Sequence, residues 1–258
     1  MTTESGTAGR VVRTALIIFP LGLVLLGAGS FIFYFNHREQ TEQRAIKYAA
    51  GLRKELNEAD LKRYQDIFLD VLAKPADERN KTLATFLEST LGPENMGYSA
   101  RSVMKKTEPD APAVAIDAEV TGARKPRDLV LVVTSFLPDL TTIDNASVAR
   151  PAAVFLNLAH SLTGDAKART IRFVTVQNLE ALKVYYDQDI SAEERISHVL
   201  LLGPLAGTTD AQVTEALHLQ GRGAVVLRPA IASGGDAASL MPSAQALRKQ
   251  VIELAERL

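Results

Sequence analysis

Few side chains in this sequence could take part in catalysis or metal binding. The 258 residues include no cysteine, which excludes disulfides, thiolate metal sites and a cysteine nucleophile. No Gly-x-Ser-x-Gly motif occurs, so the pattern of a serine hydrolase is absent. Histidine occurs only four times, at His37, His160, His198 and His218. A metal site or an acid–base site would have few imidazoles to draw on.

Two carboxylates stand where strand-like runs meet helix-like runs. Asp144, followed by Asn145, precedes the helical run 146–163, and Glu180 follows the apolar run 169–177. An Asp or Asn in front of a helix caps its first turn, and a carboxylate in the first turn suits the positive helix end. The residues alone therefore favour a capping role for Asp144, with metal binding as the alternative, and a position at the positive helix end for Glu180. His160, within a helical run, and His198, at the start of a strand-like run, are predicted to be structural.

From Lys74 onward, strand-like and helix-like segments alternate. We predict strands at 97–106, 112–120, 129–135, 169–177, 198–202 and 223–228. We predict helices at 76–91, 146–163, 179–187, 209–219 and 242–258. This alternation predicts an α/β domain, a three-layer sandwich around a mostly parallel or mixed sheet. Strands 129–135 and 169–177 should be central neighbours joined by a right-handed crossover through helix 146–163, with Val130, Val132, Phe173 and Val174 buried.

Three motif-like segments follow one another in the middle of the chain. An apolar strand, 128–135, leads to a loop reading Ile-Asp-Asn-Ala-Ser at 143–147, and the run Arg-Thr-Ile-Arg-Phe-Val at 169–174 precedes Glu180. This order resembles the zinc-dependent aminopeptidase family, which includes secreted bacterial aminopeptidases, glutamate carboxypeptidase II and the glutaminyl cyclases. Family members carry a G-A-H-x-D strand end, a D-D-N-x-S-G loop and an R-F strand followed by E-E. The resemblance covers about residues 45–258.

The resemblance implies a two-metal site, and most of its ligands are missing from this sequence. The bridging carboxylate matches Asp144, and the second of the paired glutamates matches Glu180. The histidine of the strand end falls on Ser135, and the general base falls on Leu179. No carboxylate occurs in 199–203 and no histidine in 233–236, where the family has its last two ligands. The resemblance therefore implies a degenerate member with no catalytic residues, no bound metal and no other cofactor.

An uncharged apolar run of 21 residues, Ala15–Phe35, lies near the start of the chain. As a helix it would span about 31 Å, close to the hydrocarbon thickness of a bilayer. We predict a transmembrane anchor at 15–35 after an N-terminal tail at 1–14. The alternatives are a signal peptide cleaved near residues 27–29, or a buried core helix. Residues 36–75 are predicted to be helical over 37–74, either as a stalk or packed on the domain at 76–258.

The balance of charge excludes a nucleic-acid partner, because 29 basic residues against 30 acidic ones leave no basic face. Non-catalytic relatives of the family, such as transferrin receptor, nicastrin and nicalin, act as receptors or scaffolds. By this resemblance we expect a single-pass membrane protein, a pseudoenzyme whose extracytoplasmic domain binds a protein partner. The alternative is an active metallo-aminopeptidase that recruits His160, His198 or Asp139 as ligands.

Overall fold

The computed structural model describes residues 54–104, 113–136, 143–205, 208–232 and 234–257, together with Ser30, Tyr48, Gly51 and Leu52. The chain divides into two compact units, Met1–Lys47 and Tyr48–Leu258. Apart from Ser30, the predicted anchor at 15–35 lies outside the described residues, as does the tail at 1–14. Within the described part of the chain, no helix combines the length and the apolar character that a bilayer crossing requires.

The second unit is built on a mixed sheet of six strands in the order β1-β2-β4-β3-β5-β6. Strands β4, β3, β5 and β6 run parallel, while β2 is antiparallel to β4 and β1 to β2. The strands are β1 (Arg101–Val103), β2 (Ala115–Val120), β3 (Lys125–Ser135), β4 (Arg169–Val176), β5 (Arg195–Leu202) and β6 (Val225–Leu227). The described helices are α2 (Glu58–Leu72), α3 (Ala76–Leu91), α4 (Asn145–Leu162), α5 (Leu179–Asp189), α6 (Asp210–Ala216) and α7 (Ala237–Glu256).

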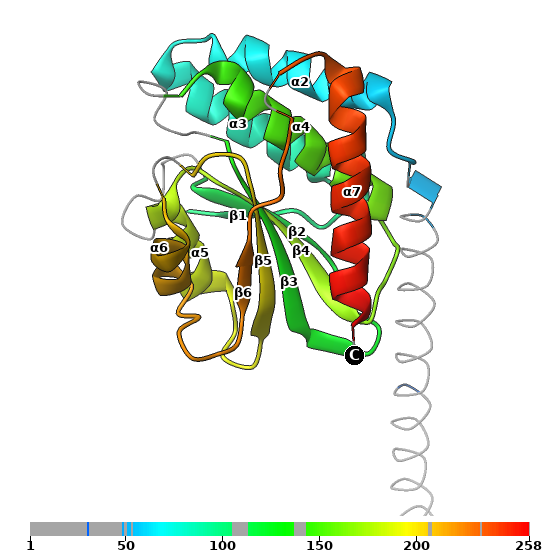
Figure 1. Cartoon of the computed structure of the whole chain (residues 1–258), viewed down its shortest axis with the longest axis vertical. Coiled ribbons are helices and arrows are strands. Elements are labelled where there is room, and N and C mark those ends of the chain that lie inside the picture. Colours follow the sequence, from blue (N-terminus) through cyan, green and yellow to red (C-terminus); the bar gives the residue numbers. More distant parts are fainter. Residues whose placement is uncertain are drawn as a thin grey trace, which may run out of the picture. The chain divides into compact units, whose positions relative to one another are not determined.

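Helices cover both faces of this sheet (Figure 1). Helices α3, α4 and α7 contact one face, and α5 and α6 contact the other. Helix α2 does not lie on the sheet; it packs on the outer side of α4 and also contacts α7 and α3. The predicted α/β architecture with a mixed central sheet is therefore confirmed.

Strand β3 lies between β4 and β5, as its unbroken apolar sequence predicts for a strand covered on both sides. Its side chains alternate between two cores. Val130 and Val132 belong to the core under α4, and Leu129, Leu131 and Val133 to the core under α5. The predicted pairing of strands 129–135 and 169–177 is confirmed, and Val130, Val132, Phe173 and Val174 are each fully buried.

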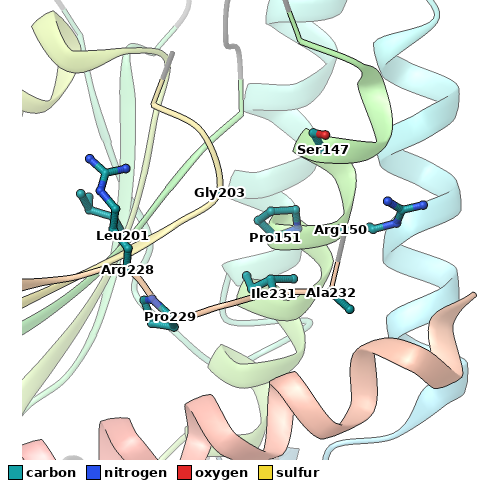
Figure 2. Close-up of a pocket in the computed structure, with 9 residues that line it drawn as sticks. All are labelled: Ser147, Arg150, Pro151, Leu201, Gly203, Arg228, Pro229, Ile231 and Ala232. Atoms are coloured by element: carbon teal, nitrogen blue, oxygen red, sulfur yellow. The ribbon is translucent and has the colours of Figure 1, made fainter. Parts of the chain in front are cut away.

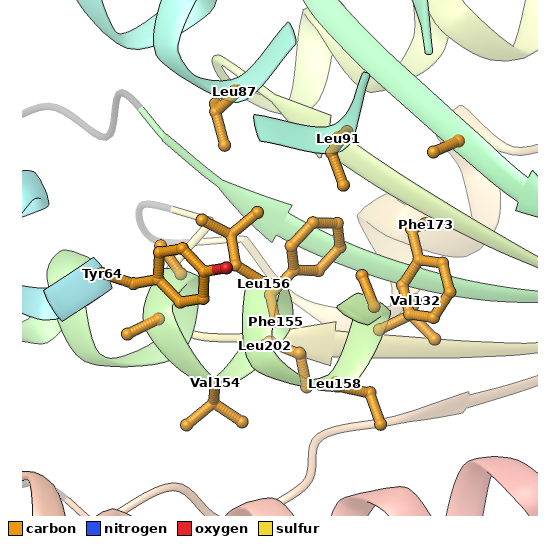
Figure 3. Packing of buried hydrophobic residues seen from close by; sticks show 14 of the residues in the cluster. Tyr64, Leu87, Leu91, Val132, Val154, Phe155, Leu156, Leu158, Phe173 and Leu202 are labelled. Carbon is orange, nitrogen blue, oxygen red and sulfur yellow. The ribbon is translucent and has the colours of Figure 1, made fainter. Parts of the chain in front are cut away.

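Helix α4 is enclosed on every side, since 14 of its 18 residues are buried. One side packs on the sheet, where the rings of Phe155 and Phe173 meet edge to face with centroids 5.7 Å apart. Tyr64 of α2 and Leu87 and Leu91 of α3 belong to the same core (Figure 3). A helix that is apolar around its circumference is stable only in such an interior position.

Several predicted boundaries differ from the structure; α7 begins at Ala237 rather than at 242, and β5 begins at Arg195 rather than at 198. The single helix over 37–74 is interrupted, because residues 54–57 are not helical and α2 begins at Glu58. Asn57 causes this start, since its side-chain oxygen accepts a hydrogen bond from the Asp60 N–H at 2.7 Å and so caps the new helix. The first strand is also shorter than the predicted 97–106, because residues 97–100 form a coil before β1.

Replacement of Phe155 by alanine should lower the free energy of unfolding by about 3–5 kcal/mol, because it leaves a cavity between α4 and β4. Met104→Ala is the control: this side chain is 46% exposed, and its loss should change stability by less than about 0.5 kcal/mol. Urea unfolding of the full chain in detergent, followed by circular dichroism, measures both. Equal effects of the two substitutions would contradict the interior position of α4.

Candidate functional site at the carboxyl edge of the sheet

The carboxyl ends of the four parallel strands meet at one edge of the sheet. Ser135 ends β3, Gln177 follows β4, Gly203 follows β5 and Arg228 follows β6. Ligands of open α/β sheets usually bind outside this edge. The family's ligand and base positions Ser135, Asp144, Leu179 and Glu180 lie at this edge of β3 or on the segments that follow β3 and β4.

Ser135 is buried, and its hydroxyl is used in the backbone framework. The Ser135 Oγ donates to the carbonyl oxygen of Gln177 at 3.1 Å, which ties the end of β3 to the residue after β4. The neighbouring Thr134 Oγ1 donates to the carbonyl oxygen of Leu202 at 3.1 Å, on the other side. These hydroxyls join three strand ends and carry no charge for a metal ion.

Asp144 is the N-cap of α4, as the residues alone predicted. One carboxylate oxygen accepts the Ser147 N–H and the other accepts the Ser147 hydroxyl, both at 2.8 Å. The hydroxyl bond and then the backbone bond hold the pKa of Asp144 below its ordinary value. Both oxygens of this carboxylate therefore serve the first turn of the helix.

Leu179 and Glu180 open α5, and neither is its cap. That role belongs to Asn178, whose side-chain oxygen accepts the Ala181 N–H at 2.9 Å. Leu179 packs against the core under α5, so the general-base position of the family is filled by an apolar contact. Glu180 is exposed and lines a groove between α5 and α6, beside Lys183 and Glu215. Glu180 lies in the first turn of α5, as predicted, where a carboxylate suits the positive helix end.

The two remaining ligand positions of the family are occupied by apolar side chains and by a helix cap. Leu200, Leu201 and Leu202 at the end of β5 are buried among apolar side chains. Of the segment 233–236, Ser233 lies outside the described residues, and Asp236 caps α7 by accepting the Ser239 N–H at 3.2 Å. This capping carboxylate could have been predicted from its place before a helical run.

The histidines considered as replacement ligands lie elsewhere. His160 is in the last turn of α4, where its Nε2 is 2.9 Å from the carbonyl oxygen of Leu52. His198 is in β5, with its Nδ1 3.1 Å from the hydroxyl of Ser197. Burial lowers the pKa of both imidazoles. Asp139 lies outside the described residues. Among the residues that the structure does describe, no three His, Asp or Glu side chains gather where they could hold a metal ion.

A cavity of about 240 Å³ lies at this edge, between α4, the end of β5 and the segment after β6. Pro151 and Gly203 lie next to each other in its lining (Figure 2). Gly203 has a φ of +79°, and a Cβ there would lie 2.7 Å from the Pro151 ring, so glycine is required for this close approach. Because Pro151 has no N–H, the Ser147 carbonyl oxygen accepts no bond from it within the helix.

The two arginines at the cavity do not converge on it. Their guanidinium groups extend to opposite sides (Figure 2). That of Arg228 donates to Asp210 at 2.6 Å and to the Thr208 carbonyl oxygen at 2.7 Å. The walls between them are Pro151, Leu201, Pro229, Ile231 and Ala232. The site is thus a small depression lined by both apolar and polar groups.

Comparison with solved structures identifies the class of fold. The chain is similar to a putative zinc-dependent exopeptidase from Bacteroides vulgatus, with 12% identity and a TM-score of 0.53 over 80% of this chain and 98% of that one. It is similar to the glutaminyl cyclase of Porphyromonas gingivalis, with 13% identity and a TM-score of 0.51 over 77% and 97%. A leucine aminopeptidase precursor from Bacteroides thetaiotaomicron gives 10% identity and a TM-score of 0.50 over 80% and 98%.

No family model and no curated protein sequence matches the chain. The similarity to the solved structures confirms the resemblance to zinc-dependent aminopeptidases and glutaminyl cyclases as a shared fold. The residues present do not fit a zinc site. Zinc needs several imidazole or carboxylate ligands in fixed geometry, and Asp144 is engaged by Ser147 while Ser135 and Leu179 supply no charge.

Proposed function

We propose that this protein is a membrane-anchored, non-catalytic module of the exopeptidase fold that acts by binding a protein partner. The observation that carries the proposal is that side chains at the family's ligand and base positions make structural contacts in this protein. Ser135 bonds to a carbonyl oxygen, Asp144 caps α4 and Leu179 packs in the core. No group at these positions can activate water or polarise a peptide bond.

The binding role is supported by the shape of the carboxyl edge. The cavity beside Pro151 and Ile231 has both apolar and polar walls and is large enough for one or two side chains of a partner. The anchor is supported by the uncharged run Ala15–Phe35, which continues past the small residues at 27–29. The resemblance to anchored relatives of this fold supports an extracytoplasmic position for the second unit.

The purified full chain should hold far less than one zinc ion per molecule and should cleave no aminoacyl-nitroanilide. Two scattered carboxylates do not provide the ligand number or the geometry that zinc requires. Elemental analysis after dialysis against micromolar zinc, with assays on a panel of substrates, measures both. Leu179→Glu should add no activity, because no metal-bound water is available to deprotonate.

Asp144→Asn is the control for this experiment, since asparagine caps a helix as well as aspartate does. It should fold and behave like the unsubstituted chain. One or two tightly held zinc ions per chain, with an activity that Asp144→Asn abolishes, would overturn the non-catalytic role and restore the rearranged metallo-aminopeptidase as the explanation.

Residues 15–35 should remain in the mature protein as a transmembrane helix. After extraction of membranes with alkaline carbonate, the chain should stay in the pellet, because an apolar helix of this length is not displaced by charge or pH. Sequencing of the mature N-terminus provides the second measurement. A product that begins near Ser30 and appears in the soluble fraction would show a cleaved signal peptide instead.

Substitution of Ala232 by phenylalanine should abolish partner binding, because the ring fills the cavity that Ala232 lines. The measurement is crosslinking in washed membranes, followed by purification of the chain and quantification of each crosslinked protein. Ala246→Phe is the matched control, since Ala246 is exposed on α7 and the same ring is added there, outside the cavity lining. A protein that both variants crosslink equally does not bind this cavity. If Ala232→Phe still crosslinks every protein that the unsubstituted chain crosslinks, the result argues against the proposed site.

A further inference from the structure

The chain enters the α/β unit through a short segment that lies along α4. This segment, called the strap here, consists of Leu52, which is helical, and residues 54–57, which are not. Two side chains of α4 hold it. Asn157 Nδ2 donates to the carbonyl oxygen of Asn57 at 2.9 Å, and His160 Nε2 lies 2.9 Å from the carbonyl oxygen of Leu52. Positions three apart on a helix share one face, so both contacts belong to a single seam.

The Asn57 end of the strap is fixed by the amide side chains of Asn57 and Asn157, which do not titrate. The Asn57 side chain caps α2 through the Asp60 N–H and also donates to the Asp60 carboxylate, both at 2.7 Å. Its carbonyl oxygen accepts from the amide of Asn157. Between the two ends, Leu56 packs against the main core.

The Leu52 end depends on the protonation state of His160. A carbonyl oxygen can only accept, so the proton of the neutral imidazole is on Nε2. The Nδ1 atom then faces the hydroxyl of Tyr64 at 3.5 Å. His160 is only 6% exposed, so a second proton on its imidazole would place a cation in a nearly closed site.

The charged groups around His160 come from three elements. Lys54 lies on the strap, and Asp60 and Arg63 lie on α2. Helix α7 brings Arg248, Lys249 and Glu253 to the neighbouring cavity, which the strap and Ser161 also line. Burial is the largest effect and lowers the pKa of His160, and the charges of Lys54 and Arg63 lower it further. The bond to Leu52 and the charge of Asp60 raise this pKa, but by less. The docked strap therefore favours the neutral imidazole.

We propose that the strap is an acid-released latch, in which protonation of His160 detaches Leu52 from α4 while Asn57 remains attached as the hinge. Release removes the strap from one wall of a cavity of about 480 Å³ between α4 and α7, exposing Ser161 and Ile252 to solvent.

The direction of the pH dependence follows from proton linkage. The exposed imidazole has the higher pKa, about 6.5, and the docked one the lower. Docking is therefore fully favoured above pH 6.5 and weakens as the pH falls from there towards the pKa of the docked state. Within that window the ratio of released to docked strap rises by at most about tenfold per pH unit.

The sequence has no cysteine, so two introduced cysteines can be spin-labelled specifically in the full chain in detergent. Glu55→Cys and Lys249→Cys place labels on the strap and on α7, at exposed positions of one cavity. We expect one short distance between the labels at pH 8 and a longer, broader distribution at pH 5. In His160→Gln, whose amide nitrogen can still donate to Leu52 and does not titrate, the distribution should be the same at both pH values.

An unchanged distance in the unsubstituted background, or an equal change in His160→Gln, would overturn the latch. Hydrogen exchange provides a measurement that needs no substitution at His160. Exchange of the amides of residues 54–57, corrected for its intrinsic pH dependence and divided by that of α7, should rise as the pH falls below 6.5. A ratio that does not vary with pH would also overturn it. Neither result bears on whether the protein binds zinc or a partner.

Discussion

The complete enclosure of α4 is the constraint on which the rest of the unit depends. Because the sheet covers only one side of this helix, its other sides must be covered by further elements, and α2 and α7 provide them. Its buried polar side chains must also find partners, since an unpaired polar group in the interior is costly. Ser161 bonds within the helix, to the Leu158 carbonyl oxygen at 2.8 Å. Asn157 and His160 bond to the strap, so the segment before α2 is part of what makes α4 stable.

The opposite face of the sheet is held by buried charge as well as by apolar packing. Asp117, which is fully buried, accepts hydrogen bonds from Arg101 and from Tyr185 of α5. Arg172 donates to Glu119 at 2.8 Å and to Glu194 at 2.5 Å, which fixes the loop after α5. Removing one member would leave an uncompensated buried charge, so this network specifies one arrangement of α5 on β2 and β4.

Most of the fold could be predicted from the sequence, because apolar alternation, turns and caps mark each element. The start of α2 could have been read from Asn57 with Asp60 three residues later, but the good helix formers on both sides concealed it. The site was harder to predict. Arg172, which contributed to the family resemblance, is engaged in the buried network, and Asn178, which we did not predict as a cap, caps α5. A motif gives the residue types in order, but only packing decides which contacts each side chain makes.

At the carboxyl edge, positions where the family resemblance implies metal ligands take part in structural contacts instead. Ligands of a metal site bring like charges together and leave polar atoms unsatisfied when the ion is absent, which costs stability. Three of the corresponding positions have ordinary structural contacts: a hydroxyl on a carbonyl oxygen at Ser135, a cap at Asp144 and apolar packing at Leu179. These three residues therefore stabilise the edge through a hydrogen bond between strand ends, a helix cap and an apolar contact.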